Sequence, residues 1–160
     1  MKRIIIGIDY DPTAEKVAQT AYNLFIGSNI GITLLHVVAN EVYYSSRAYS
    51  PIMGFTGFVP AEPIEGEQTQ FLMEAAGEYL DKTRDYLGDV NISTIVKEGN
   101  FADTILATAE ELNADLIVVG SHSRRWLEKI VMGSVTEEII RLSKIPVLVV
   151  PTGKEKKDAT

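Results

Sequence analysis

Small residues at two places in the second half of the chain predict an anion-binding loop. Gly120-Ser-His-Ser123 follows an apolar run, and after a spacer of nine residues Gly133-Ser134 opens an amphipathic segment. Free backbone N–H groups and the positive end of the helix dipole attract anions at a helix start. A loop without bulky Cβ atoms also lets phosphate oxygens come close. The spacing therefore predicts a nucleotide-phosphate site.

Ser134 has a second interpretation, which is purely structural. With Glu137 three residues later it forms the pattern of a capping box, which stabilises a helix start by about 1 kcal/mol. The combination of Gly133 with Gly120 at this spacing favours the phosphate interpretation, but one hydroxyl could serve both purposes.

Asp9 is an acid directly after an apolar run at 4–8. It could form an Asx turn together with Asp11, or it could contact ribose hydroxyls or a bound metal. The ligand contact is favoured for Asp9, whereas capping is favoured for Asp11, because Asp11-Pro12 is typical of a helix start.

The remaining residue types exclude several chemistries. There is no cysteine, no Ser-His-Asp order and no GxxxxGK[ST] motif, so thiolate nucleophiles and motor-type nucleotide hydrolysis are excluded. His36 lies inside an apolar run and is expected to be a core residue, whereas His122 could touch phosphate. Arg124 could neutralise phosphate charge or simply be solvated.

Because no efficient general base is visible, we expect a binding module with slow or no hydrolysis. An enzyme that acts on a nucleotide or phosphorylated substrate through His122 or Asp9 is the alternative.

Composition and charge set the broad class. The 160 residues carry a formal charge of −7, which argues against a general nucleic-acid binder. No apolar stretch is long enough to span a bilayer, and Asp9 interrupts the first apolar run too early for a signal peptide, so a cytoplasmic protein is expected. We expect one domain at 1–152 and a charged tail at 153–160. The Gly-, Pro- and aromatic-rich segment at 40–69 is expected to be an insertion packed on that domain, with a lid or partner surface as the alternative.

Apolar runs alternate with helical patterns along the chain. Strands are expected at 4–8, 32–38, 90–96, 116–119 and 147–150, and helices from Pro12, at 71–87, after Asn100 and at 134–143. Strands that are apolar on both faces predict a five-stranded parallel open α/β sheet with helices on both faces. Ligands bind such sheets beyond the carboxyl ends of the strands, where the strand order reverses. A reversal between the first and fourth strands would bring Asp9 and Gly120 to one crevice.

Several of these motifs resemble the nucleotide-binding branch of the universal stress protein family, over nearly the whole chain. The loop with Gly133-Ser134 and the following Pro-Val-Leu-Val-Val strand resembles the family's phosphate loop, and the first strand ending in Asp9 resembles its first strand. The strand ending at Val37 and the Glu98-Gly99 exit are similar as well. The resemblance implies an adenine nucleotide alpha hydrolase-like, Rossmann-like fold and a role in stress response. It also implies binding of ATP or a related adenine nucleotide, with Mg or Mn as the accompanying cation. The implied contacts are Asp9, Val37, Gly120, Ser121, His122, Ser123, Arg124, Gly133, Ser134 and Val135.

Ser123 departs from the family pattern, which has glycine at this loop position. If the position needs a positive φ, serine is strained there by about 1 kcal/mol. If it needs only a small side chain, the serine hydroxyl could donate to phosphate. The departure also keeps open a nucleotide-free dimeric scaffold protein.

The last apolar run, 147–150, is expected to form the edge of the sheet. An uncovered apolar edge invites pairing, and a two-fold partner strand would satisfy it. The resemblance implies the same homodimer, while Pro151 and the charged tail could instead protect the edge. One of Leu148 and Val149 is expected to face outward.

Overall fold

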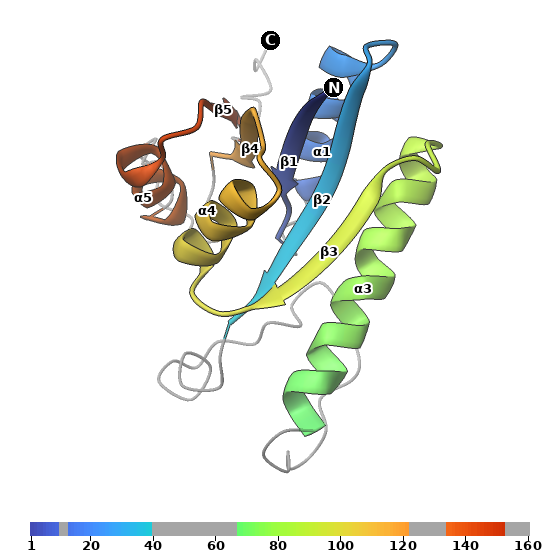
Figure 1. Ribbon diagram of the computed structural model, residues 1–160. Coiled ribbons are helices and arrows are strands. Elements are labelled where there is room, and N and C mark those ends of the chain that lie inside the picture. Colours follow the sequence, from blue (N-terminus) through green and yellow to red (C-terminus); the bar gives the residue numbers. More distant parts are fainter. Residues whose placement is uncertain (10–12, 40–66, 122–133, 153–160) are drawn as a thin grey trace, which may run out of the picture.

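Five parallel strands form one open sheet in the computed structural model of the protein (Figure 1). The structure describes residues 1–9, 13–39, 67–121 and 134–152. The strands lie in the order β3-β2-β1-β4-β5. Their bounds are β1 Lys2–Gly7, β2 Ile30–Val38, β3 Ser93–Glu98, β4 Leu116–Gly120 and β5 Val147–Val150. The predicted parallel α/β sheet is confirmed, and its strand order reverses between β1 and β4 as expected.

The central strands are buried on both faces, which explains their continuous apolar runs. In β1, Ile4, Ile5 and Ile6 are each at most 2% exposed. Ile4 and Ile6 belong to one core cluster and Ile5 to another, because successive side chains of a strand point to opposite faces. The sheet therefore separates the two larger hydrophobic cores, and Val38, Leu72 and Ala76 form a third, smaller cluster of β2 and α3.

Each face of the sheet is covered by two of the helices that the structure describes (Figure 1). α1 (Ala14–Phe25) and α3 (Glu67–Leu87) contribute to the core around Ile4 and Ile6. α4 (Phe101–Glu111) and α5 (Ser134–Leu142) contribute to the core around Ile5. Within the described ranges, none of these helices has the length and apolar character that a membrane crossing requires.

The third strand was predicted three residues too early. It begins at Ser93, and Val90 is 88% exposed in the connection that precedes it. Gly88 ends α3 at a φ of +72°, and the Asp89 carboxylate accepts from the Asn91 N–H at 2.9 Å. This Asx turn takes up the residues that an apolar pattern alone assigns to the strand.

Asp89 also contacts α1. Burial, followed by the nearby Asp89 carboxylate, raises the pKa of the Tyr22 phenol, whose hydroxyl donates to Asp89 at 3.4 Å.

The starts of two helices also differ from expectation. α1 begins at Ala14, not at Pro12, and Leu24 is 59% exposed because it lies at the border of the buried stripe of this helix. α3 begins at Glu67, so the predicted insertion at 40–69 loses its last three residues to a helix. The rest of that insertion, together with Asp11 and Pro12, lies outside the described residues.

His36 is a satisfied core residue, as predicted. It is 5% exposed, and its ring Nδ1 lies 2.7 Å from the carbonyl oxygen of Ile8. The edge of the ring also faces Tyr79, with the two ring centroids 6.5 Å apart. This histidine therefore holds the exit of β1 against β2.

The outer strand β5 presents backbone, not a side chain, at its free edge. Leu148 packs on the core of α1 and α3, while Val147 and Val149 pack on the core of α4 and α5. The expectation that Leu148 or Val149 faces outward is therefore wrong, because side chains of a strand alternate between the faces of the sheet and do not point from its edge.

Replacing Gly99 with alanine is expected to lower the free energy of unfolding more than Gly88→Ala does. Gly99 leads from β3 into α4 at a φ of +149°, and a Cβ there would lie 2.5 Å from Thr104 Oγ1. Gly88 has nothing within 4 Å of such a Cβ. Gly88→Ala should cost about 1 kcal/mol through its left-handed backbone. Gly99→Ala should cost more, because its φ also disfavours a side chain and the Thr104 hydroxyl must in addition move away. Urea unfolding of both variants measures the difference, and equal losses would contradict this account.

Candidate functional site

Asp9 and Val37 lie at the same level of the carboxyl edge of the sheet. Gly7 of β1 is opposite Leu35 of β2, and the Ile8 N–H donates to the Leu35 carbonyl at 2.9 Å, which continues the ladder. Extending this register by two residues puts Asp9 level with Val37. The Asp9 residue is exposed, whereas Val37 is 5% exposed and packs in the core, so its backbone is the part that a ligand could reach.

The same row continues across β4. Ile6 pairs with Val118, so extending that register by three residues puts Asp9 level with Ser121. β1 and β4 are also the two strands between which the strand order reverses. The row of Asp9, Val37 and Ser121, which we call the switch-point row, therefore lies where open α/β sheets bind their ligands.

Ser121 joins the exits of β4 and β5. Its N–H donates to the Val150 carbonyl at 2.9 Å, and its Oγ accepts from the Thr152 N–H at the same distance. The two hydroxyls of Ser121 and Thr152 are 3.3 Å apart. Sequence reasoning missed this structural role because Thr152 follows 31 residues later. The Ser121 hydroxyl proton can still be donated either to Thr152 or to a ligand.

Close packing around Gly120 favours a residue without a side chain. A Cβ at this position would lie 3.0 Å from Val17 Cγ2 and 3.1 Å from Thr152 Cγ2. The absence of a side chain thus lets α1 and the chain after β5 close on the end of β4. This close approach explains the glycine without any contribution from a phosphate.

Thr136 holds the first turn of α5 on the end of β4. Its Oγ1 donates to the Gly120 carbonyl at 2.8 Å, and the residue is 5% exposed. Val135, beside it, is half-buried against the core of α4 and α5. The amino end of α5 is therefore brought to the same edge as the switch-point row. Sequence reasoning missed Thr136, although a threonine two residues into a helix after Gly-Ser was a possible signal.

The other predicted contacts are not part of the switch-point row. His122, Ser123, Arg124 and Gly133 lie outside the described residues, and their roles stay predictions. α5 begins at Ser134, as the sequence predicts.

In the parts of the chain that the structure describes, no three His, Asp or Glu side chains come together as a metal site. A cation at this edge would therefore need ligand oxygens besides Asp9.

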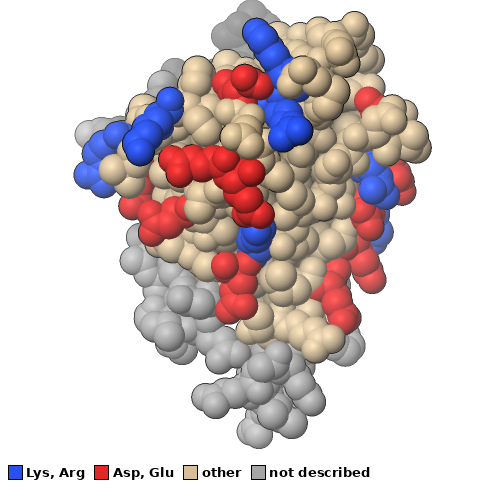
Figure 2. Space-filling view, in the orientation of Figure 1, with Lys and Arg blue, Asp and Glu red and all other residues tan. Residues whose placement is uncertain are grey.

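Charges of both signs are scattered over the visible face of the described residues (Figure 2). Asp and Glu gather on the middle of this face, and Lys and Arg lie mainly toward its margins. The formal charge of −7 agrees with this picture.

Known proteins match this chain over nearly its whole length. The sequence model of the Universal stress protein family matches residues 1–151. Universal stress protein MJ0577 of Methanocaldococcus jannaschii is 30% identical over 152 residues, which are 93% of this chain and 94% of that protein. A solved structure of MJ0577 covers 96% of this chain and 98% of its own, with 29% identity and a TM-score of 0.75. A universal stress protein solved in complex with cAMP has a TM-score of 0.65 at 18% identity, over 95% of this chain and 98% of its own.

Thr136→Val is expected to lower the free energy of unfolding by about 1–2 kcal/mol, because it keeps the shape of the side chain but leaves the partly buried Gly120 carbonyl without its donor. Thr136→Ser keeps the hydroxyl and serves as the control, with the loss of a methyl group costing about 0.8 kcal/mol. Chemical denaturation measures both. If the serine variant is the less stable of the two, the hydrogen bond is not what holds α5.

Proposed function

Because the chain belongs to the universal stress protein family, we propose that it binds ATP or a related adenine nucleotide at the carboxyl edge of its sheet. The observation that carries this proposal is the switch-point row beside the start of α5. Open α/β sheets bind ligands at such a reversal of strand order. The cAMP complex of another universal stress protein supports an adenine nucleotide as the class of ligand.

The nucleoside would lie over the exits of β1 and β2. Asp9 is exposed there, so its carboxylate would accept from the ribose hydroxyls or bind an accompanying Mg²⁺ or Mn²⁺. Carboxylate oxygens suit both of these roles, since hard cations prefer oxygen ligands. The Val37 backbone would contact the base, because the Val37 side chain is taken up by the core.

The phosphates would lie between the exit of β4 and the start of α5. Backbone N–H groups at Gly133, Ser134 and Val135 would point at them, and the dipole of α5 would add to the attraction. The loop would contribute Gly120, Ser121, His122, Ser123 and Arg124. Arg124 would supply a positive charge, and Ser121 would contribute the proton that it otherwise shares with Thr152.

The proposed role is that of a sensor or regulatory module with slow or no hydrolysis. No efficient general base is evident in the sequence, and the loop has no lysine of the GxxxxGK[ST] type. Ser123 favours one other candidate, a nucleotide-free dimeric scaffold protein, because the resembling family pattern has glycine there. Nucleotide that stays bound through purification would separate the two, since a scaffold of that kind would release none on denaturation.

The unmodified protein is expected to bind ATP in titration calorimetry, and Gly133→Val is expected to abolish this binding while unfolding remains cooperative. A branched side chain at 133 would block the approach of phosphate to the backbone. Gly77→Ala is the control, because Gly77 lies in α3 with nothing within 4 Å of its Cβ position. Lack of ATP binding by the unmodified protein at millimolar ATP would overturn the proposal. Rapid turnover of Mg-ATP would instead favour an enzyme.

We also infer that two copies of the chain pair through β5. Val147–Val150 contains no charged residue, whereas β3, at the other end of the sheet, contains Lys97 and Glu98. Charged residues protect an edge strand from pairing, and an apolar edge favours it. No described strand lies on the outer side of β5.

The hydrogen bonds of β5 indicate which groups are available for this pairing. Ile117 donates to the Pro146 carbonyl at 3.0 Å, and Ser121 donates to the Val150 carbonyl at 2.9 Å. The backbone N–H and C=O groups of the even-numbered residues in this strand therefore face β4. Since alternate residues face opposite sides, the N–H and C=O groups of Val147 and Val149 face the free edge.

Val149→Pro is therefore expected to give a folded protein whose dimer is weakened at least about tenfold, for a loss of one or two hydrogen bonds. Proline is tolerated on an edge strand when the missing N–H pointed outward, so the bonds to β4 remain. Val149→Thr keeps the N–H and the branched side chain and is the control. Light scattering at micromolar concentration gives the mass. A monomer mass for the unmodified protein would refute the dimer.

A further inference from the structure

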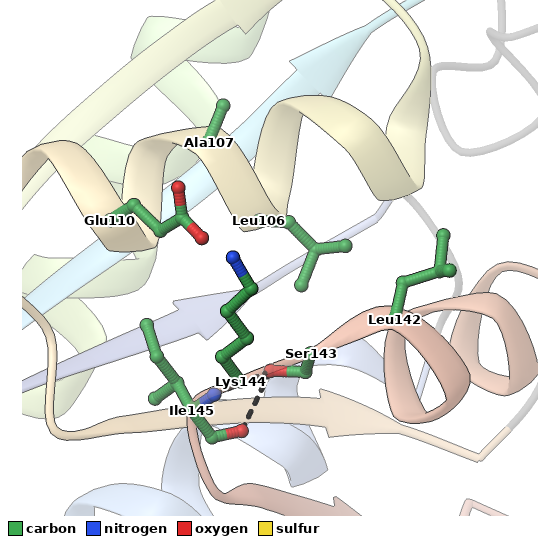
Figure 3. Close-up of a pocket in the computed structure, with 7 residues that line it drawn as sticks. All are labelled: Leu106, Ala107, Glu110, Leu142, Ser143, Lys144 and Ile145. Carbon is green, nitrogen blue, oxygen red and sulfur yellow. Dashed lines mark hydrogen bonds between the residues drawn. The ribbon is translucent and has the colours of Figure 1, made fainter.

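A hollow of about 250 Å³ opens between α4 and the chain that follows α5 (Figure 3). α4 contributes Leu106, Ala107 and Glu110, and the opposite wall is formed by residues 142–145. The Glu110 carboxylate and the Lys144 ammonium group point toward one another across it, with apolar side chains around them (Figure 3). The hollow thus offers an apolar surface with one acid and one base.

The hollow lies at the opposite edge of the sheet from the switch-point row. Lys144 and Ile145, which line it, directly precede β5, so it is beside the amino end of this outer strand. The Ser143 hydroxyl donates to the Ile145 carbonyl at 2.6 Å and fixes the turn between α5 and β5. The wall of the hollow is therefore rigidly joined to the edge at which we expect the dimer to form.

We propose that this hollow receives residues 153–160 of a second copy of the chain. The proposal rests on the inferred dimer through β5. In an antiparallel two-fold pair, the end of one strand lies beside the start of the other. The tail of one protomer would therefore leave the shared sheet where the hollow of its partner begins.

The outward-facing groups make this placement insensitive to the exact register. Val147 and Val149 can meet their two-fold copies in three ways: Val147 with Val147, Val147 with Val149, or Val149 with Val149. These pairings put position 144 level with position 150, 152 or 154 of the partner subunit, respectively. In each case residues 153–160 begin within a few residues of the hollow.

The protomer's own residues 153–160 are less well placed to reach the hollow than those of the partner subunit. Thr152 follows the carboxyl end of β5, whereas the hollow is at the amino end of that strand. The own tail would have to return along the whole strand before it reached the hollow. The partner's tail would begin at the hollow, with its whole length available for contact.

The charges of the two surfaces are complementary. Residues 153–160 read Gly-Lys-Glu-Lys-Lys-Asp-Ala-Thr, with three lysines and two acids. The hollow presents Glu110, whereas Glu111, which follows it on α4, is already paired with Lys97 at 3.1 Å. A lysine of the tail would meet the Glu110 carboxylate, while Lys144 would face one of the two acids of the tail. Asp and Glu also gather on the middle of the face in Figure 2, where α4 lies in Figure 1.

The absence of cysteine from the sequence allows a direct test, because introduced thiols are then the only ones. Ala107→Cys, on the exposed side of α4, and Lys156→Cys, in the tail, are prepared in separate chains, mixed to exchange protomers and mildly oxidised. We expect a disulfide-linked dimer in which mass spectrometry joins the peptide of position 107 to that of position 156. Lys16→Cys, which is exposed on α1 of the other face, replaces Ala107→Cys in the control and should give a several-fold lower yield.

A second measurement tests the charges. Glu110→Lys, added to the chain with Ala107→Cys, should lower the cross-link yield several-fold, and Glu110→Gln should lower it less. Added salt should weaken the cross-link of the unmodified hollow, because exposed ion pairs are screened.

The outcomes separate this proposal from those on which it rests. A dimer in light scattering without the 107–156 link overturns the tail docking and leaves the dimer intact. A monomer overturns both. In a chain that carries Ala107→Cys and Lys156→Cys together, a disulfide within one monomer would mean that the tail binds its own hollow, which also overturns the proposal. Nucleotide binding enters none of these measurements.

Discussion

The end of β4 has little space for a side chain, and the geometry of the candidate site depends on this constraint. Val17 from α1 and Thr152 from the chain after β5 approach Gly120 so closely that a Cβ would contact both at about 3 Å. The carbonyl of the same residue accepts the hydroxyl of Thr136 from α5. One glycine thus sets the distances of three neighbouring segments from the carboxyl edge of the sheet. Because two of these contacts exclude side-chain atoms and the third uses the backbone, the arrangement depends on shape more than on chemistry.

Most of the fold follows from local pattern. Strands in a sheet covered by helices are nearly continuous apolar runs, so β1, β2, β4 and β5 could be predicted from the sequence. The reversal of strand order between β1 and β4 was predicted from the family resemblance, because apolar runs do not give the order of the strands. The start of β3 could not be predicted in this way, because Val90 is apolar but belongs to a turn that Gly88 and the Asp89 carboxylate create. Hydrophobicity does not register such a turn, since it is held by a side chain bonding to the backbone.

The site was predicted less completely than the fold. The positions of Asp9, Val37 and Gly120 at one edge follow from topology alone. The roles of Thr136 and Thr152 do not, because their partners are 16 and 31 residues away in the sequence. Gly120 and Ser121, which resemble part of a phosphate loop, also have structural roles. Gly120 lets α1 and the chain after β5 pack closely on β4, and Ser121 joins the exits of β4 and β5. A pattern of residue types therefore indicated where to look, but it did not indicate how many contacts each residue already makes.

α5 also has a mechanical consequence. Its nine residues span about 13 Å, so this short helix extends from the carboxyl edge of the sheet toward the amino edge. Thr136 fastens its first turn to the end of β4, and the Ser143 hydroxyl fastens the chain that leaves its last turn. The helix therefore joins the two edges of the sheet, with its first turn held at the candidate site and its last turn held beside the hollow.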